Sequence, residues 1–246
     1  MLPSATGVGA LGLCPPGRVT VSRVTSSLKR PLGGCLVCAS GLVLVALLAF
    51  RVAPVQRLDA SVLSRLTVLG GSSPGAFAGF AVDLVDPLPL LAILSLACLL
   101  AMRRGRPRRA VAALALVAGA NLTTQALKVA LAHPRYQSVL GYRQIGSASF
   151  PSGHATAAMS MPLAFVLVVP RAWRGGVALF GACLVAIVGC SVVVLHRHYP
   201  SDVIGGLLVA AGWFFAVLAG LRMPAAATRQ PAGSARRGGG EGRSSR

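Results

Sequence analysis

Three groups of polar residues lie beside long apolar runs, where ionisable side chains are costly to bury and are therefore candidates for function. They occupy residues 121–135, 151–154 and 196–202. Between them they supply cations, histidines, a carboxylate and the start of a helix. This combination suits phosphoryl transfer, in which negative charge on the phosphate oxygens is stabilised while a nucleophile attacks phosphorus.

The first group places Lys128 on the same helical face as Asn121, Thr124 and Gln125. That face must turn toward the interior of a bundle or toward water. Arg135 follows just beyond the helix and adds a second cation. Two cations this close in sequence could bind a phosphate group.

The second group, Pro151-Ser152-Gly153-His154, opens another apolar run. Free backbone N–H groups and the positive end of the helix dipole can hold an anion at such a position. The same residues also have a purely structural interpretation, as a turn that caps the helix.

The third group contains His198 and, four residues later, Asp202 at a predicted helix start. A carboxylate that accepts a proton from one ring nitrogen leaves the lone pair of the other nitrogen free to attack phosphorus. A second histidine, His154, completes a pair that can serve as nucleophile and acid. Because the chain has no pair or cluster of carboxylates to hold Mg²⁺, we expect a reaction without metal or other cofactor.

Six apolar stretches that are long enough, or nearly so, to cross a hydrocarbon core of about 30 Å position these groups. They cover residues 35–53, 84–102, 110–132, 153–170, 175–195 and 202–221. The first two groups share one loop, and two crossings separate His154 from His198, so all three groups emerge on one membrane face. The predicted fold is an all-α bundle of six transmembrane helices with the active site at the outer face.

The composition excludes a soluble enzyme, a disulfide-stapled secreted domain and a disordered basic protein. Hydrophobic residues make up 54% of the 246 residues and charged residues 12%, and the mean hydropathy is +0.72. The 24 basic and five acidic residues give a net charge of +19, which would suit a nucleic-acid binder. However, the basic residues stand in short clusters between apolar runs, as orientation signals do.

The distribution of lysine and arginine predicts which side of the membrane each loop occupies. With the N-terminus inside, seventeen of these residues lie on the cytoplasmic side and six on the outer side. We therefore expect a multi-pass protein of the cell membrane with both termini cytoplasmic. The cluster from Arg103 to Arg109 then serves orientation, and no nucleic-acid partner is expected.

The predicted organisation has three parts. Residues 1–34 form a basic, flexible, cytoplasmic N-terminus, residues 35–222 form the membrane domain, and residues 223–246 form a disordered basic tail. One outer segment, residues 58–69, has apolar residues at helical spacing. It is predicted either as an amphipathic helix at the outer interface or as a short packed connector.

The three motifs together resemble a known family. Lys128-x6-Arg135, Pro151-Ser152-Gly153-His154 and Ser191-x6-His198-x3-Asp202 are similar, in this order, to the signatures of the type 2 phosphatidic acid phosphatases. These are integral-membrane lipid phosphatases related to glucose-6-phosphatase and vanadium haloperoxidases. The resemblance extends over residues 121–221.

The resemblance implies a role for each matching residue. His198 would attack phosphorus to give a phosphohistidine, Asp202 would orient it, and His154 would protonate the leaving oxygen. The phosphate would be bound by Lys128, Arg135, Ser152 and the amide of Gly153. The substrate would be a phosphate or diphosphate monoester of a polyprenyl lipid or glycerolipid, and the oligomeric state stays open.

One position departs from the family pattern. The third motif of the family has arginine directly after its serine, whereas this chain has Val192. Arg143, in the same loop as Arg135, is a further candidate for binding the phosphate in its place. The alternative function is therefore a catalytically weak or inactive membrane protein that binds a lipid phosphate.

Overall fold

A computed structural model of the chain describes residues 21–71, 73–132 and 145–223, and every regular element in these ranges is a helix. The α-helices are α1 (Val21–Arg51), α2 (Ala53–Thr67), α3 (Ser73–Asp83), α4 (Pro87–Arg103), α5 (Pro107–Ala130), α7 (Gly153–Val168), α8 (Arg174–Val194) and α9 (Pro200–Arg222). Two short 3₁₀ helices, η1 (Val68–Gly71) and η2 (Arg171–Trp173), complete the description.

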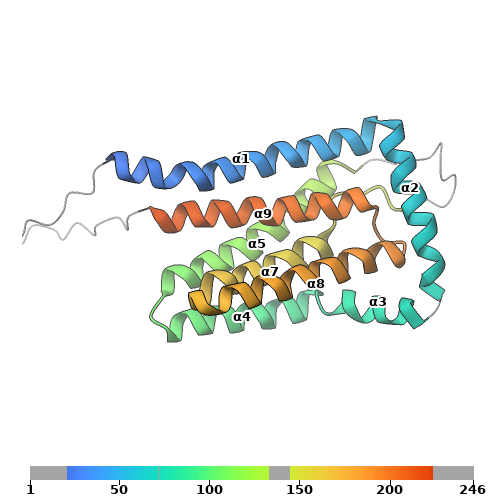
Figure 1. The fold of residues 1–246 in the computed structure, drawn as a ribbon. Helices are drawn as coiled ribbons and strands as arrows, with labels where there is room; N and C mark the ends of the chain where they lie inside the picture. Colours follow the sequence, from blue (N-terminus) through green and yellow to red (C-terminus); the bar gives the residue numbers. More distant parts are fainter. Residues whose placement is uncertain (1–20, 72, 133–144, 224–246) are drawn as a thin grey trace, which may run out of the picture.

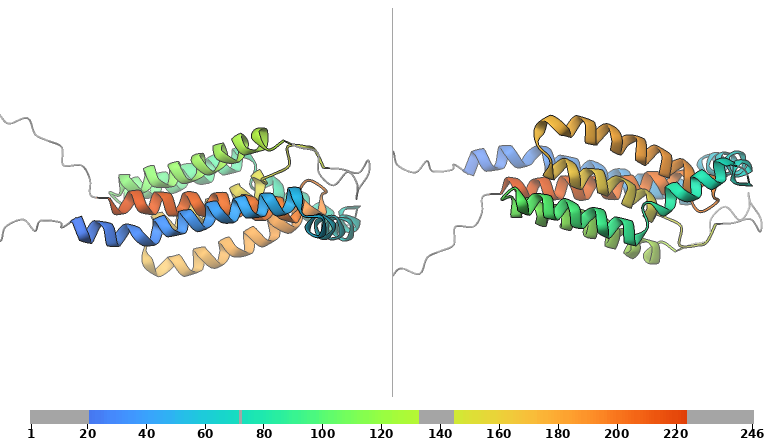
Figure 2. Two further views of the ribbon diagram at one scale, coloured as in Figure 1. Left: turned by 90° about the horizontal axis from the view of Figure 1, so that it is seen from above. Right: turned by 90° about the horizontal axis from the view of Figure 1, so that it is seen from below.

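The long helices run side by side, and α2 lies across one end of the bundle with α3 beside it (Figure 1). The views from above and below show the same arrangement (Figure 2). Helix α7 is the central element, because it packs against α4, α5, α8 and α9. Helix α1 packs chiefly against α9. The start of α1 and the end of α9 lie at the end of the bundle opposite α2 (Figure 1).

Local sequence explains the sharp reversal between α4 and α5. Gly105 adopts a φ of 63°, which a residue without Cβ reaches at no steric cost. Arg106 N then donates to Ala101 O over 2.9 Å, the bond that closes a Schellman turn. Pro107 begins α5 at once, since its missing N–H is not needed in a first turn.

All six apolar stretches are helical, as predicted. Within the described residues, four helical segments are long and apolar enough to cross a membrane: Ser27–Arg51, Pro107–Ala130, Arg171–Val194 and Pro200–Arg222. Helices α3 and α4, bent by 49° at their junction, make a fifth span if they are counted together. Helix α7 has 16 residues, or about 24 Å, and is mostly buried among its neighbours. The count of six crossings stays a prediction.

The N-terminal boundary differs from the predicted one. Helix α1 begins at Val21, so residues 21–34 are helical where a flexible segment was predicted. Contacts with α9 stabilise this extension, since Arg222 Nη1 donates to Ser27 O over 2.7 Å. At Gly34 a Cβ would stand 2.6 Å from the ring of Phe215, so the absence of a side chain allows close packing. The predicted tail lies outside the described residues beyond Met223.

The segment predicted as an amphipathic helix or a connector is helix α2. Its buried side chains are Asp59, Ala60 and Leu63, and these face the end of the bundle. Asp59 Oδ1 accepts a hydrogen bond from Ser201 N over 3.2 Å, which joins α2 to the start of α9. Helix α2 therefore covers the end of the bundle at which α9 begins.

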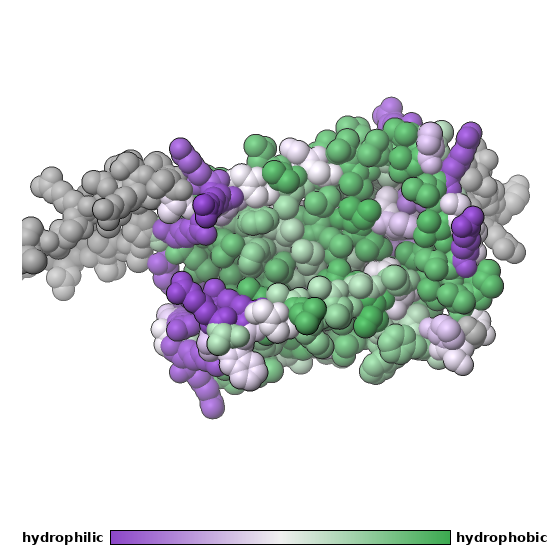
Figure 3. Space-filling model, viewed as in Figure 1, coloured by the Kyte–Doolittle hydropathy of each residue, from purple (hydrophilic) through white to green (hydrophobic). Residues whose placement is uncertain are grey.

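On the face shown in Figure 3, hydrophobic residues cover the middle of the molecule and hydrophilic residues gather at its two ends. Many large apolar side chains point outward, among them Leu36, Val37 and Leu122, each about 70% exposed. A soluble protein would bury such residues, whereas lipid accommodates them. The structure thus has the exterior of a membrane protein.

Candidate active site

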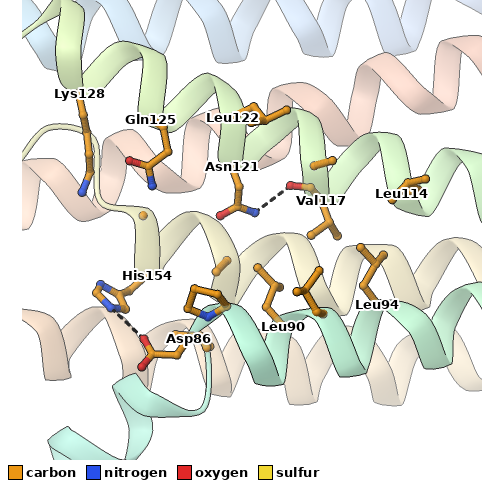
Figure 4. A pocket seen from close by; sticks show the side chains of 16 residues that line it. Asp86, Leu90, Leu94, Leu114, Val117, Asn121, Leu122, Gln125, Lys128 and His154 are labelled. Atoms are coloured by element: carbon orange, nitrogen blue, oxygen red, sulfur yellow. Dashed lines mark hydrogen bonds and ion pairs between the residues drawn. The ribbon is translucent and has the colours of Figure 1, made fainter.

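The polar residues that the sequence singles out and the structure describes meet at one end of the bundle, the end covered by α2. There α5 ends, α7 and α9 begin, and the 195–199 segment joins α8 to α9. Lys128 and Gln125 from α5, His154 from α7 and Asp86 from the α3–α4 junction face one another (Figure 4). The arrangement brings together four segments that are far apart in the sequence.

His198 and Asp202 form a buried pair. His198 Nδ1 lies 3.5 Å from Asp202 Oδ2, and Asp202 is fully buried. The same carboxylate oxygen accepts a hydrogen bond from Tyr199 N over 3.0 Å. The distance of 3.5 Å is long for a hydrogen bond, and Nδ1 meets no closer acceptor among the described residues. The Asp202 carboxylate thus approaches the Nδ1 side of the His198 ring, so that Nε2 is the nitrogen left to react with a substrate.

His154 lies against both His198 and a second carboxylate. The two imidazole ring centres are 6.1 Å apart and their planes are inclined by 65°. His154 Nε2 lies 3.6 Å from Asp86 Oδ1, at the start of α4. Two rings this close can act on opposite ends of one phosphoester group.

Lys128 reaches toward the first turn of α7. Its Nζ lies 3.9 Å from the point where a Cβ on Gly153 would stand. An anion at this place would meet an ammonium group, and the backbone N–H groups at the start of α7 face the same region. The arrangement can hold a phosphate group.

A cavity of about 520 Å³ opens from these polar residues along α4 and α5. Its polar end is formed by Asp86, Asn121, Gln125, Lys128 and His154. Apolar side chains line the remainder, namely Val85, Leu90, Leu91, Leu94, Leu114, Val117 and Leu122. An amphiphile with an anionic head and an apolar tail fits this division of the walls.

Ser152 is placed differently from the predicted phosphate contact. Its side chain is fully buried, and its Oγ accepts a hydrogen bond from Ala155 N over 3.3 Å, which makes it the N-cap of α7. Thr156 Oγ1 lies 2.9 Å from Ser152 O and 2.9 Å from Thr124 Oγ1. The structural interpretation of this turn is therefore confirmed, and Thr124 serves packing rather than the cavity.

Comparison with known proteins connects this geometry to a family. The model of the PAP2 superfamily matches residues 109–224, a range that includes Lys128, His154, His198 and Asp202. Over this range, a little under half of its length, the chain is similar to the PAP2 superfamily. This confirms the resemblance found in the three motifs, since PAP2 is the type 2 phosphatidic acid phosphatase group.

Two curated relatives match a short part of the chain. Over 66 residues the chain is 46% identical to proteins named lipid A 1-phosphatase from Rhizobium etli and Rhizobium johnstonii. The alignment covers 27% of this chain and 26% and 25% of the two relatives. The chain therefore matches about a quarter of the length of these relatives.

A solved structure shares the fold. The crystal structure of a transmembrane PAP2-type phosphatidylglycerolphosphate phosphatase from Bacillus subtilis superposes with a TM-score of 0.60 at 20% identity. The match covers 75% of this chain and 94% of that chain. Together with the apolar helices, it supports a multi-pass membrane protein.

Three predicted positions need separate mention. Arg135 and Arg143 lie outside the described residues, so their roles stay predictions. Val192 is fully buried in an apolar cluster that also contains Val85, Ala157 and Tyr199. The place of the family arginine is thus occupied by a packing residue.

Asp86 is the site residue that sequence reasoning missed. In the sequence it stands beside Pro87, near the start of the 84–102 stretch, and it lies outside the residues matched by the PAP2 model. One signal could have found it, because the predicted topology places Asp86 on the same membrane face as the three motifs. Its contact with His154 depends on the packing of α4 against α7.

Proposed function

We propose that this protein is an integral-membrane phosphatase that hydrolyses a phosphate or diphosphate monoester of a lipid. The observation that carries the proposal is the pair of imidazole rings of His154 and His198, 6.1 Å apart, of which His154 lines the polar end of a mostly apolar cavity. A lipid could place its head group beside these rings while its tail follows the apolar wall of α4 and α5.

In the proposed first step, Nε2 of His198 attacks phosphorus and forms an N–P bond as the P–O bond to the lipid breaks. His154 gives its proton to the leaving oxygen, so the lipid departs as an alcohol or, from a diphosphate, as a monophosphate. Asp202 holds the His198 ring and stabilises its positive charge.

In the proposed second step, water attacks the phosphohistidine and His154 accepts the proton of that water. The N–P bond breaks, inorganic phosphate leaves, and His198 is restored. Since His154 must start protonated and His198 must start neutral at Nε2, activity should show a bell-shaped dependence on pH. A flat profile from about pH 5 to 9 would contradict these paired roles.

We propose that Lys128 and the Gly153 amide bind the phosphate, together with Arg135 and Arg143. Ser152 would contribute mainly as the N-cap that stabilises the start of α7, in line with its burial. Positive charge from these groups would stabilise the equatorial phosphate oxygens. We propose that the reaction needs no metal ion.

We propose a site that faces the outer side of the membrane. Asp86, His154 and His198 lie at the end of the bundle opposite the arginines of residues 103–109, and arginine-rich ends favour the cytoplasm. The substrate would then be presented in the outer leaflet.

The first experiment measures phosphate release by the purified full chain in the presence of EDTA. The panel contains lipid A, phosphatidylglycerophosphate, phosphatidic acid and a polyprenyl diphosphate, the first two suggested by the similar proteins. His198→Ala should lower turnover at least about 10³-fold. His196→Gly is the matched control. It changes another histidine of the same loop, leaves the proposed nucleophile in place, and should retain activity. Equal release by wild type and His198→Ala would contradict the proposal.

A second candidate is a weak or inactive binder of a lipid phosphate, favoured by the burial of Val192 where the family has arginine. In that case His198→Ala would leave binding of a lipid phosphate unchanged and wild type would show no turnover above it. Binding measured on the same lipid panel by tryptophan fluorescence or native mass spectrometry separates the two candidates.

A further inference from the structure

A second cavity, of about 600 Å³, lies at the end of the bundle opposite the histidines. The start of α5, the ends of α7 and α9, and the start of α8 enclose it. Six arginines line it: Arg106, Arg108, Arg109, Arg171, Arg174 and Arg222. Hydrophilic side chains gather at this end of the molecule in the space-filling view (Figure 3).

The arginines have no acidic partner in this cavity. Among the described residues that line it, none is Asp or Glu. The aspartates that the structure describes, Asp59, Asp83, Asp86 and Asp202, belong to α2, the α3–α4 junction and the start of α9, at the other end. Six arginine residues therefore line one hollow whose charge the described protein does not neutralise.

Backbone carbonyls use only part of the hydrogen-bonding capacity of these arginines. Arg108 Nη2 donates to Met223 O over 2.7 Å and Arg109 Nη1 to Leu167 O over 2.8 Å. Each guanidinium has five N–H donors, so most donors remain for another ligand. The Nε of Arg174 is buried and meets no acceptor among the described residues. A phosphate can accept several such donors at once.

The remaining wall of the cavity is apolar. Val166 and Leu167 from α7 and Leu218 and Leu221 from α9 line it. A soluble anion would gain nothing from this surface, whereas an acyl chain would be sheltered by it. The cavity thus combines a cationic rim with an apolar wall, as sites for lipid head groups between transmembrane helices do.

Membrane orientation alone does not explain this arrangement. A surplus of arginine at one end satisfies the positive-inside rule wherever the side chains point. Arg103 and Arg104 show this, because they lie at the same end, are exposed, and do not line the cavity. The six other arginines converge on one hollow instead.

We propose that this cavity binds the phosphate head group of an anionic phospholipid, with an acyl chain against the leucines of α7 and α9. The site is separate from the histidine site, and the proposal does not rest on the proposed phosphatase activity. Occupancy would hold the ends of α5, α7, α8 and α9 together.

The test is native mass spectrometry of the full chain in detergent, titrated with phosphatidylglycerol, cardiolipin or phosphatidylcholine. We expect saturable binding of the two anionic lipids and at least tenfold weaker binding of phosphatidylcholine. Arg106→Gln with Arg174→Gln should weaken anionic-lipid binding at least tenfold. The matched control, Arg103→Gln with Arg104→Gln, removes the same charge from the same end and should change binding less than twofold.

Three outcomes would overturn the proposal. Equal weakening by both double variants would indicate diffuse attraction rather than a built site. Displacement of the lipid by millimolar inorganic phosphate would indicate a site for free phosphate. Loss of binding in Lys128→Gln would place the lipid at the histidine end instead.

If the double variant does not fold, Arg171→Gln, an exposed residue of the rim, replaces it, with an expected loss of at least threefold against Arg103→Gln.

Discussion

At the scale of single residues, the orientation of His198 depends on one carboxylate oxygen. Asp202 Oδ2 lies near both His198 Nδ1 and Tyr199 N, so it holds the ring and the start of α9 together. Because Asp202 is completely buried, this oxygen has no competing contact with bulk water. Neutralising the Asp202 carboxylate should therefore change the rate of the proposed reaction directly.

Asp202→Asn should lower kcat by about 10²–10⁴-fold with a smaller change in KM, since an amide can present its NH₂ to the ring and favour the wrong tautomer. Steady-state kinetics on the preferred lipid measures this. The melting temperature is the control for folding. A variant that melts like wild type and turns over at the same rate would remove Asp202 from the mechanism.

Asp86→Asn should lower kcat about three- to tenfold, because the Asp86 carboxylate favours the protonated form of His154. The effect is moderate because both side chains are partly exposed to solvent. With that carboxylate neutral, His154 loses its proton more easily, so the alkaline limb of the pH profile should move to lower pH. Asp83→Asn, three residues earlier and exposed, is the matched control. An identical pH profile for wild type and Asp86→Asn would contradict this role.

At the scale of elements, the end of α8 presents His198 through an unusual turn. Arg197 N donates to Val192 O over 2.9 Å in a Schellman arrangement, and His196 occupies the left-handed position with a φ of 56°. Glycine is the usual residue there, because a side chain costs about 1 kcal/mol in that conformation. The loop that carries the proposed nucleophile is therefore locally strained.

His196→Gly should raise the free energy of unfolding by about 0.5–1 kcal/mol, since glycine adopts a positive φ without strain. Thermal melting in detergent provides the measurement. His196→Ala keeps the Cβ and should bring no such gain. If both variants melt at the same temperature, the strain argument fails.

Close approach of two backbones positions the start of α7. A Cβ on Gly206 of α9 would collide with Ser152 O and would stand 3.0 Å from Thr156 Oγ1. Glycine at this position allows the turn before His154 to rest directly on α9. The relative placement of His154 and His198 depends on this contact.

Gly206→Ala should destabilise the protein by about 1–3 kcal/mol and lower kcat, because the added methyl group pushes the Ser152 turn away from α9. Melting temperature and turnover should fall together. Gly220→Ala, in the same helix but with open space around the added carbon, should melt within a degree or two of wild type. Equal behaviour of the two variants would show that the contact does not matter.

At the scale of the whole molecule, the two ends of the bundle differ in charge and in chemistry. His154, His198, Asp86 and Asp202 lie at the end that α2 covers, and the arginine cavity lies at the opposite end. By the positive-inside rule, we predict that the arginine end lies in the cytoplasm. The proposed phosphatase site then faces outward.

Cysteine labelling tests this orientation. In a variant lacking the six native cysteines, Ser64→Cys on α2 should react with a membrane-impermeant maleimide added to intact cells. Ala172→Cys, beside the arginine cavity, should react only after the membrane is permeabilised. Both positions are exposed, so a reversed pattern would mean a reversed orientation.

The sequence by itself determined the helices, their approximate limits and the grouping of the three motifs on one face. Apolar runs with polar ends are local properties of the chain, and alternating crossings assign each loop to a face without knowledge of packing. The resemblance to the PAP2 family was readable for the same reason, since the motifs that carry it are short and lie in order along residues 121–221.

The tertiary structure decided which side chains meet. Asp86 approaches His154, α7 is enclosed by four neighbours, and six arginines line one cavity. None of these contacts follows from spacing within one segment. They depend on how each helix is rotated and how closely it packs against the others, and this is set by side-chain packing between segments that are distant in the sequence.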